Sequence, residues 1–204
     1  MSTAAIYLAH LNPMTRSHES IISILKEKYN TVYIFPVRFL KGVREINTKS
    51  FPFSYEVRKD MVESVFGKRV IILPEYTFCA PFIMYLPPLL SPRSWQLRYK
   101  IVSQITEDRF VSYTGDKAER LMLKAYMLNP LNADRLEISA SMIKEELYQQ
   151  AKTGTGDNDW QDRVPEPVVD IIKENWNTVT KFSRLPDDTI RVMGMKFPRE
   201  GYYK

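Results

Sequence analysis

The sequence predicts an α/β fold, a Rossmann-like open parallel sheet of about five strands with helices on both faces and a C-terminal helical extension. Short apolar runs of strand length alternate with segments whose apolar residues have helical spacing. The first two runs flank such a segment, which predicts parallel strands joined by a right-handed crossover. We expect residues 1–152 to form the core and residues 153–204 to form a C-terminal helix and tail packed on it.

Composition narrows the class of protein. The chain has 204 residues, of which 44% are hydrophobic and 26% charged, so it can build a core. Its net charge of +5 fits anionic ligands such as nucleotides, but it is too mild and dispersed to indicate a nucleic-acid partner. A single cysteine, Cys79, excludes an internal disulfide and a Cys-rich zinc site and favours a reducing compartment.

The sequence gives no sign of export or of a membrane partner. The first residues lack a basic segment followed by a long apolar one, so we expect no signal peptide. The longest apolar run, residues 79–90, contains three prolines and is too short to be a membrane helix. We therefore expect a cytoplasmic protein.

The opening stretch organises the rest of the chain. Residues 4–8 predict a buried first strand, which Asn12-Pro13 ends because the residue before proline avoids the α region. We expect Ser17 to cap a helix that runs to about residue 29. Arg16 and His18 then lie at the carboxyl end of the strand, where open α/β sheets bind ligands and a helix start favours phosphate.

The remaining elements follow in order. Residues 47–53 resemble a loop, and Ser54 is expected to cap the second helix. Further strands are expected at 32–37, 69–73 and 110–113, and further helices at 94–105, after Asp116, from Ser139 and from Pro165. Residues 151–162 are expected to be a flexible loop, and the tail from residue 185 has no clear periodicity.

Residues 74–93 are rich in proline and aromatic side chains, which excludes a regular helix or a central strand. Three interpretations stay open for this stretch: a lid over a ligand pocket, a contact in a homo-oligomer, or an irregular segment packed on the sheet edge.

Three segments, in this order, resemble one family. They are residues 12–18 (NPMTRSH), the turn after the fourth strand at 114–119 (TGDKAE) and residues 138–144 (ISASMIK). They resemble the HIGH-motif nucleotidyltransferase superfamily, which includes mononucleotide adenylyltransferases and cytidylyltransferases. The chain departs from the family pattern at Ser17, where a glycine is usual, and at Lys144, where an arginine is usual.

The resemblance implies the roles of individual residues. Implied catalytic residues are His18, Thr15, Lys49 and Lys144. Implied nucleotide-binding residues are Leu8, Ala9, His10, Asn12, Arg16, Gly115, Asp116, Ile138, Ser139 and Ser141. The substrate-binding candidates are Arg38, which follows the second strand and can reach a ligand phosphate, and Arg58, which the resemblance implies as a helper that orients the substrate loop. No carboxylate cluster suggests a metal site in the protein, so the resemblance implies Mg²⁺ that arrives with the nucleotide.

The implied reaction is attack of a phosphorylated small molecule on the α-phosphorus of a nucleoside triphosphate, with release of pyrophosphate. A helix beginning near Val164-Pro165 is similar to that of long-form adenylyltransferases and favours ATP, with nicotinamide mononucleotide as one acceptor. The alternatives are a cytidylyltransferase that uses CTP on a phosphate or phosphonate acceptor, and a degenerate member that binds nucleotide without catalysis. A third alternative is a structural protein that uses the aromatic stretch 76–95 as an interface.

Overall fold

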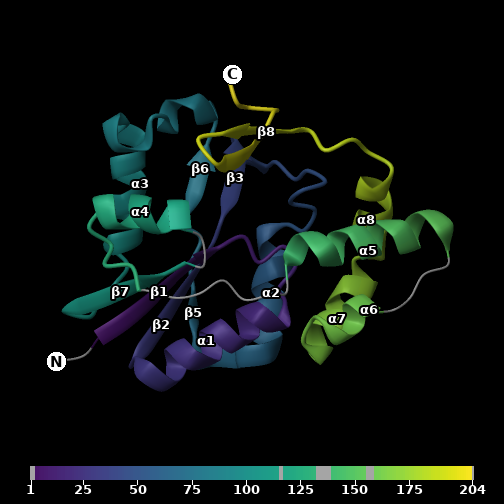
Figure 1. Cartoon of the computed structure of the whole chain (residues 1–204), viewed down its shortest axis with the longest axis horizontal. Helices are drawn as coiled ribbons and strands as arrows, with labels where there is room; N and C mark the ends of the chain where they lie inside the picture. Colours follow the sequence, from purple (N-terminus) through teal and green to yellow (C-terminus); the bar gives the residue numbers. More distant parts are fainter. Residues whose placement is uncertain (1–2, 115–116, 132–138, 155–158, 204) are drawn as a thin grey trace.

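The computed structural model describes residues 3–114, 117–131, 139–154 and 159–203 (Figure 1). Its main sheet has four parallel strands in the order β5-β2-β1-β7, which confirms the predicted fold class with four rather than about five strands in the described residues. The strands are β1 (Thr3–Ala9), β2 (Thr31–Pro36), β5 (Ile71–Ile72) and β7 (Arg109–Tyr113).

The central strand β1 is buried on both faces because its interior carries no charged residue. Ile6 pairs with Tyr33 of β2 on one side and with Ser112 of β7 on the other. Alternate residues of β1 face two separate apolar clusters, with Ala5 and Tyr7 in one and Ile6 and Leu8 in the other.

Helices cover both faces of the sheet, as Figure 1 shows. One apolar cluster packs under helices α1, α2, α5, α7 and α8, and the other under α3 and α4. The helices are α1 (Arg16–Lys28), α2 (Tyr55–Phe66), α3 (Pro92–Val102), α4 (Lys117–Ala125), α5 (Ala140–Thr153), α6 (Asp159–Asp162), α7 (Glu166–Glu174) and α8 (Trp176–Ser183). In the described residues, no helix combines the length and the apolar character needed to cross a membrane.

Two small sheets were not predicted. The segment after β2 forms a mixed sheet in the order β4-β3-β6, and the C-terminal tail folds into an antiparallel hairpin of two strands. In the hairpin turn, Met193 and Gly194 have φ values of 50° and 81°, as a two-residue hairpin turn requires. The strands are β3 (Arg38–Lys41), β4 (Arg44–Glu45), β6 (Thr77–Cys79), β8 (Thr189–Val192) and β9 (Met195–Pro198).

Several helix boundaries differ from the predictions. Thr15, not Ser17, caps α1, and Ser91 caps α3 three residues before the predicted start. Helix α5 runs to Thr153 and α6 follows, so much of the predicted 151–162 loop is helical. The helix that starts after Pro165, as predicted, breaks at Asn175, which ends α7 and precedes α8.

Other local predictions are confirmed. Ser54 caps α2 by accepting a hydrogen bond from the Val57 N–H, and Ser139 caps α5. Residues 74–93 hold no regular helix up to Pro92 and no central strand, only β6 and the short 3-10 helices η2 (Phe82–Tyr85) and η3 (Pro88–Leu90). A third 3-10 helix, η1 (Gly67–Arg69), follows α2. The predicted cap at Asp116 lies outside the described residues.

Candidate functional site

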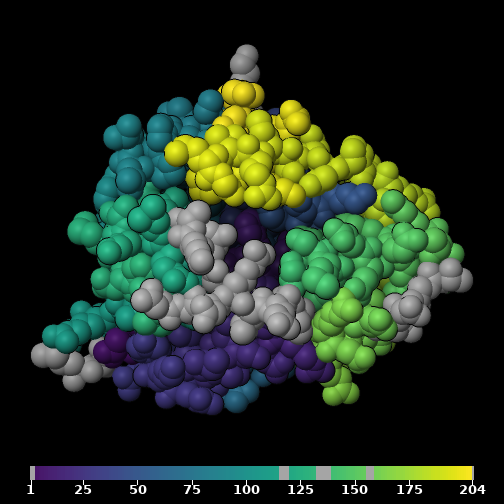
Figure 2. All heavy atoms as spheres, in the orientation of Figure 1, coloured from purple at the N-terminus to yellow at the C-terminus, as the bar shows by residue number. Residues whose placement is uncertain are grey.

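A hollow lies beyond the carboxyl end of β1, bounded by α5 and the β8–β9 hairpin. Figure 2 shows purple atoms of the N-terminal segment at its bottom, between the green helix and the yellow hairpin. Four side chains from different elements interact electrostatically there: His10 after β1, His18 on α1, Lys144 on α5 and Lys196 on β9. Imidazole and ammonium groups gathered at the end of a parallel strand form a natural site for a phosphorylated ligand.

Thr15 and His18 form the reciprocal cap of α1. The Thr15 hydroxyl accepts a hydrogen bond from the His18 backbone N–H at 3.3 Å, and His18 Nδ1 accepts one from the Thr15 backbone N–H at 3.0 Å. Because a backbone N–H can only donate, Nδ1 carries no proton and a neutral ring carries its proton on Nε2. Burial, with a smaller effect of Lys144, lowers the pKa of His18 to about 4, so the ring is neutral at pH 7.

His10 lies on an aromatic platform. Its ring stacks on Phe51 with centroids 4.5 Å apart and planes 10° apart, while the residue itself is exposed to the hollow. The groups around the His10 ring displace water from it, which lowers the pKa of His10 well below its ordinary value. The positive charges of Arg58 and Lys144 lower this pKa further. His10 is therefore a second neutral imidazole at this edge.

Two lysines converge on Ser50, in the loop before α2. Lys144 Nζ donates to the Ser50 carbonyl, and Lys196 Nζ donates to the Ser50 hydroxyl at 2.7 Å and to the Asp187 carboxylate at 3.1 Å. Burial and then the charge of Lys196 lower the pKa of Lys144 to about 8, against the opposing effect of Asp187. Sequence reasoning missed Lys196, because nothing in the tail signals that a strand brings it to the hollow.

Arg58 and Asn12 fix the backbone around the carboxyl end of β1. Arg58 is only 2% exposed, and its guanidinium donates to the carbonyls of His10 at 2.8 Å and Val37 at 2.7 Å. It also forms an ion pair with Glu45 at 3.0 Å. The Asn12 amide donates to the Phe53 carbonyl and accepts from the Phe53 N–H, at 2.8 and 3.1 Å. In the described arrangement both side chains hold backbone rather than face the hollow.

The structure does not bring three predicted cations into the hollow. Lys49 Nζ donates to the carbonyls of Ser183 and Leu185 at 3.2 and 3.0 Å. Arg16 donates to the Asp162 carbonyl at 2.7 Å, beside α6. The Arg38 guanidinium lies over the Tyr55 ring, 4.6 Å from its centroid.

The other predicted residues that the structure describes lie at the end of β1 and at the start of α5. Ser139 accepts a hydrogen bond from the Ser141 N–H at 3.2 Å at the start of α5, and Ser141 is exposed. Ala9 ends β1 with its carbonyl bonded to the Val37 N–H at 3.0 Å. The interaction of His18 with Lys144 brings the first turn of α1 and the second turn of α5 to one site. The predicted residues Gly115, Asp116 and Ile138 lie outside the described residues.

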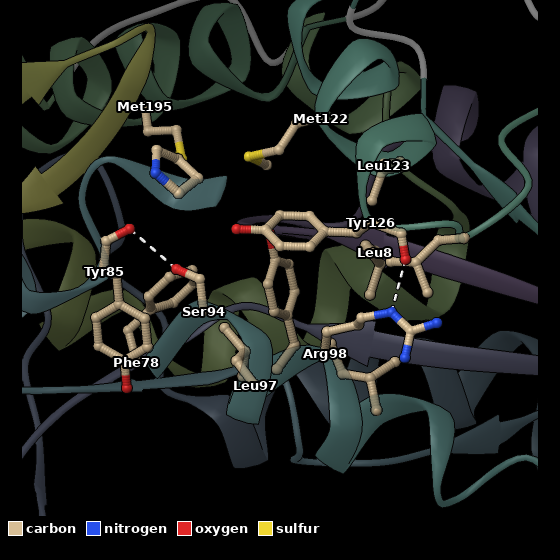
Figure 3. Close-up of a pocket in the computed structure, with 14 residues that line it drawn as sticks. Leu8, Phe78, Tyr85, Ser94, Leu97, Arg98, Met122, Leu123, Tyr126 and Met195 are labelled. Atoms are coloured by element: carbon tan, nitrogen blue, oxygen red, sulfur yellow. Dashed lines mark hydrogen bonds between the residues drawn. The ribbon is translucent and has the colours of Figure 1, made fainter. Parts of the chain in front are cut away.

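A small apolar pocket lies next to the hollow, with a volume of about 50 Å³ (Figure 3). It is lined by Leu8 of β1, by Leu97 and Ile101 of α3, by Leu123 of α4 and by Met195 of the hairpin. The Tyr126 hydroxyl points into the pocket, and its polar neighbour there is the Ser94 hydroxyl. Among the described residues it forms no hydrogen bond of normal geometry, although the residue is only 6% exposed. The lining of the pocket is therefore mostly apolar.

The same architecture occurs in known enzymes. The chain has the fold of mononucleotide adenylyltransferases. A bifunctional NMN adenylyltransferase/ADP ribose pyrophosphatase from Francisella tularensis matches 91% of this chain with a TM-score of 0.62 and 16% identity. This chain spans about half of that protein, 51% of its length.

Two further structures match nearly whole chains. Plasmodium falciparum nicotinic acid mononucleotide adenylyltransferase, complexed with NaAD, has a TM-score of 0.54 and 13% identity over 87% of this chain and 98% of its own. A putative nicotinate-nucleotide adenylyltransferase from Vibrio parahaemolyticus has a TM-score of 0.53 and 14% identity over 89% and 97%. No protein-family model and no curated protein sequence matches the chain.

In the described part of the chain, no group of three or more His, Cys, Asp or Glu side chains is placed to hold a metal ion. The Francisella protein has also been solved with AMP and a manganese ion.

Proposed function

We propose that the chain is a nucleotidyltransferase that moves AMP from ATP to a phosphorylated small molecule such as nicotinamide mononucleotide, releasing pyrophosphate. The observation that carries the proposal is the meeting of His10, His18, Lys144 and Lys196 at the carboxyl end of β1. It occurs in a fold that the chain shares with mononucleotide adenylyltransferases.

The reaction needs positioning and charge stabilisation more than covalent chemistry from the protein. An oxygen of the acceptor phosphate attacks the α-phosphorus, a new P–O bond forms, and the bond from the α-phosphorus to the bridging oxygen breaks. The electron pair leaves with pyrophosphate. His18 would donate its Nε2 proton as a hydrogen bond to a non-bridging α-phosphate oxygen, and Lys144 would neutralise charge on the leaving pyrophosphate.

Mg²⁺ bound to the triphosphate would reduce the charge that the lysines must balance. We propose that it arrives with the nucleotide. The described side chains gathered here include imidazoles, ammonium groups and the carboxylate of Asp187, which is already bonded to Ser50 and Lys196. Hard divalent cations prefer oxygen ligands, and triphosphate oxygens supply them.

The apolar pocket supports an acceptor that carries a base. Leu8 and Met195 line it, and each lies within two residues of a group at the hollow, His10 and Lys196. We propose that the edge of the acceptor's planar base meets the mouth of this pocket, which at about 50 Å³ is too small to enclose a ring, while the acceptor phosphate faces the lysines. The Tyr126 hydroxyl, which forms no hydrogen bond of normal geometry among the described residues, would then bond to the base.

One experiment tests the proposal and its alternatives. Pyrophosphate release is measured with ATP or CTP, Mg²⁺ and a panel of phosphorylated acceptors, together with the thermal shift that each nucleotide produces. Release with ATP and a mononucleotide is expected. Stabilisation by CTP alone would reassign the chain as a cytidylyltransferase. Tight nucleotide binding without release for any acceptor would favour a binding protein.

A further inference from the structure

Two ammonium groups are held together at one rim of the hollow. Lys144 bonds the Ser50 carbonyl and Lys196 bonds the Ser50 hydroxyl, so the two charges bracket a single residue. The charge of Lys196 is the largest electrostatic contribution that lowers the pKa of Lys144. Two like charges bonded to one residue repel each other, and an anion bound between them would reduce that repulsion.

One carboxylate partly neutralises the pair. Asp187 accepts from Lys196 at 3.1 Å and also from the Ser50 N–H and hydroxyl, at 3.1 and 2.7 Å. Glu145, the next residue after Lys144 on α5, is exposed to solvent. His10 and His18, which also face the group, are neutral and can each donate one N–H. The group keeps an excess of positive charge and hydrogen-bond donors.

The hairpin holds Lys196 in place from behind. The next residue, Phe197, is 1% exposed and lies among Phe39, Phe78 and Phe82, with ring centroids 5.9, 5.7 and 6.2 Å away. Because neighbouring side chains of a strand point to opposite faces, the burial of Phe197 directs Lys196 away from this aromatic cluster. The burial of Phe197 therefore fixes the position of Lys196 on β9.

We propose that Lys196 is a phosphate ligand of the hollow, supplied by the C-terminal hairpin, and that Asp187 is the counter-ion that a bound phosphate displaces from it. The proposal rests on the proposed function, because it takes the polyphosphate of that reaction as the ligand. It adds a binding residue from a part of the chain that lies outside all three segments of the family resemblance.

In the alternative hypothesis, Lys196 and Asp187 have only a structural role, which is to hold the hairpin against the Ser50 loop. The two readings predict opposite results for Asp187. If the pair is only a clamp, then removing either charge loosens the same contact and weakens phosphate binding alike. If Lys196 is a phosphate ligand, removing the charge of Asp187 frees it for the anion.

The test is calorimetric titration of the whole chain with magnesium pyrophosphate and, separately, with inorganic phosphate. K196Q is expected to weaken pyrophosphate binding about tenfold, the size of one lost charge-assisted hydrogen bond. D187N is expected to leave it unchanged or to tighten it. The matched control is R199Q, which removes a positive charge from the same hairpin at the exposed Arg199–Asp188 pair. It should change binding less than twofold.

Thermal melting shows whether each variant is folded, and Lys196→Met, which keeps the apolar stem, replaces K196Q if that variant does not fold. The proposal would be overturned if K196Q and D187N lost pyrophosphate affinity equally, or if K196Q kept its affinity. It would also be overturned if the protein without substitutions bound neither pyrophosphate nor phosphate. Failure of the proposed function gives a separate result. Pyrophosphate binding would still depend on Lys196, while no nucleotide and acceptor pair would yield product.

Discussion

Substitution of His18 tests the proposed mechanism well, because its ring has two roles that different variants can separate: it caps α1 and it can donate a hydrogen bond to a ligand. The ring accepts the Thr15 backbone N–H through Nδ1 and leaves Nε2–H for a ligand. His18→Ala removes both, so it should lose about 10²–10³-fold in turnover from the missing donor. It should also lose about 1 kcal/mol of stability from the missing cap.

His18→Gln separates the two effects. Glutamine at this position of a capping box can reach the Thr15 N–H, so we expect H18Q to keep nearly all of the stability. Its amide cannot donate from the place of Nε2 at the same time, so the loss of turnover should persist at about 10²-fold or more. The measurements are single-turnover product formation from ATP and acceptor, and urea unfolding. A loss of turnover below threefold in both variants would remove His18 from the mechanism.

The same residue predicts how stability depends on pH. The folded-state pKa of His18 is about 4, below the unfolded value of about 6.5, so the unfolded chain binds more protons between these values. The contribution of His18 to the free energy of unfolding is therefore fully present above pH 6.5 and is lost as the pH falls toward 4. The loss should be about 2 kcal/mol at pH 5. Urea unfolding at pH 7 and pH 5 should show this loss, and H18Q should reduce it. An equal loss in H18Q would contradict the assignment.

Three further outcomes are expected. Lys144, with a pKa near 8, should lose its charge as the pH rises, so pyrophosphate affinity should fall above pH 8, while K144R should hold it to higher pH in the same titration. R58M should destabilise the fold by about 3–5 kcal/mol in urea unfolding, because it leaves Glu45 and two carbonyls without their partner. The control variant K59M, at a partly exposed residue with one surface ion pair, should cost about 0.5 kcal/mol or less. Y126F should raise the KM for the acceptor several-fold and leave the KM for ATP unchanged, and an unchanged acceptor KM would place the base elsewhere.

The parts of the fold that the sequence predicts are those whose cause is local. An uncharged run such as residues 4–8 has no stable alternative to burial, so β1 was predicted within a residue at each end. The sequence predicts Ser17 as the cap of α1, but Thr15, two residues earlier, is also a residue type that caps helices. Thr15 is the observed cap, since His18 can reach back to it from the third helical position.

The missed parts have causes that lie far apart in the chain. Lys196 becomes a site residue only because Phe197 packs against Phe39 and Phe78, more than 100 residues earlier in the sequence. Similarly, Lys49 follows the family pattern in sequence, but its ammonium meets the carbonyls at the end of α8. Neither arrangement leaves a period or motif that a single sequence could reveal.

The most direct measurement follows the α-phosphate itself. The chain is incubated with ATP labelled at the α-phosphorus, Mg²⁺ and a mononucleotide acceptor, and the products are separated. The account predicts that the label moves into a dinucleotide with one equivalent of unlabelled pyrophosphate, and that H18A nearly abolishes this transfer. A folded protein that binds ATP but leaves the label in ATP for every phosphorylated acceptor, and does the same with CTP, would contradict it.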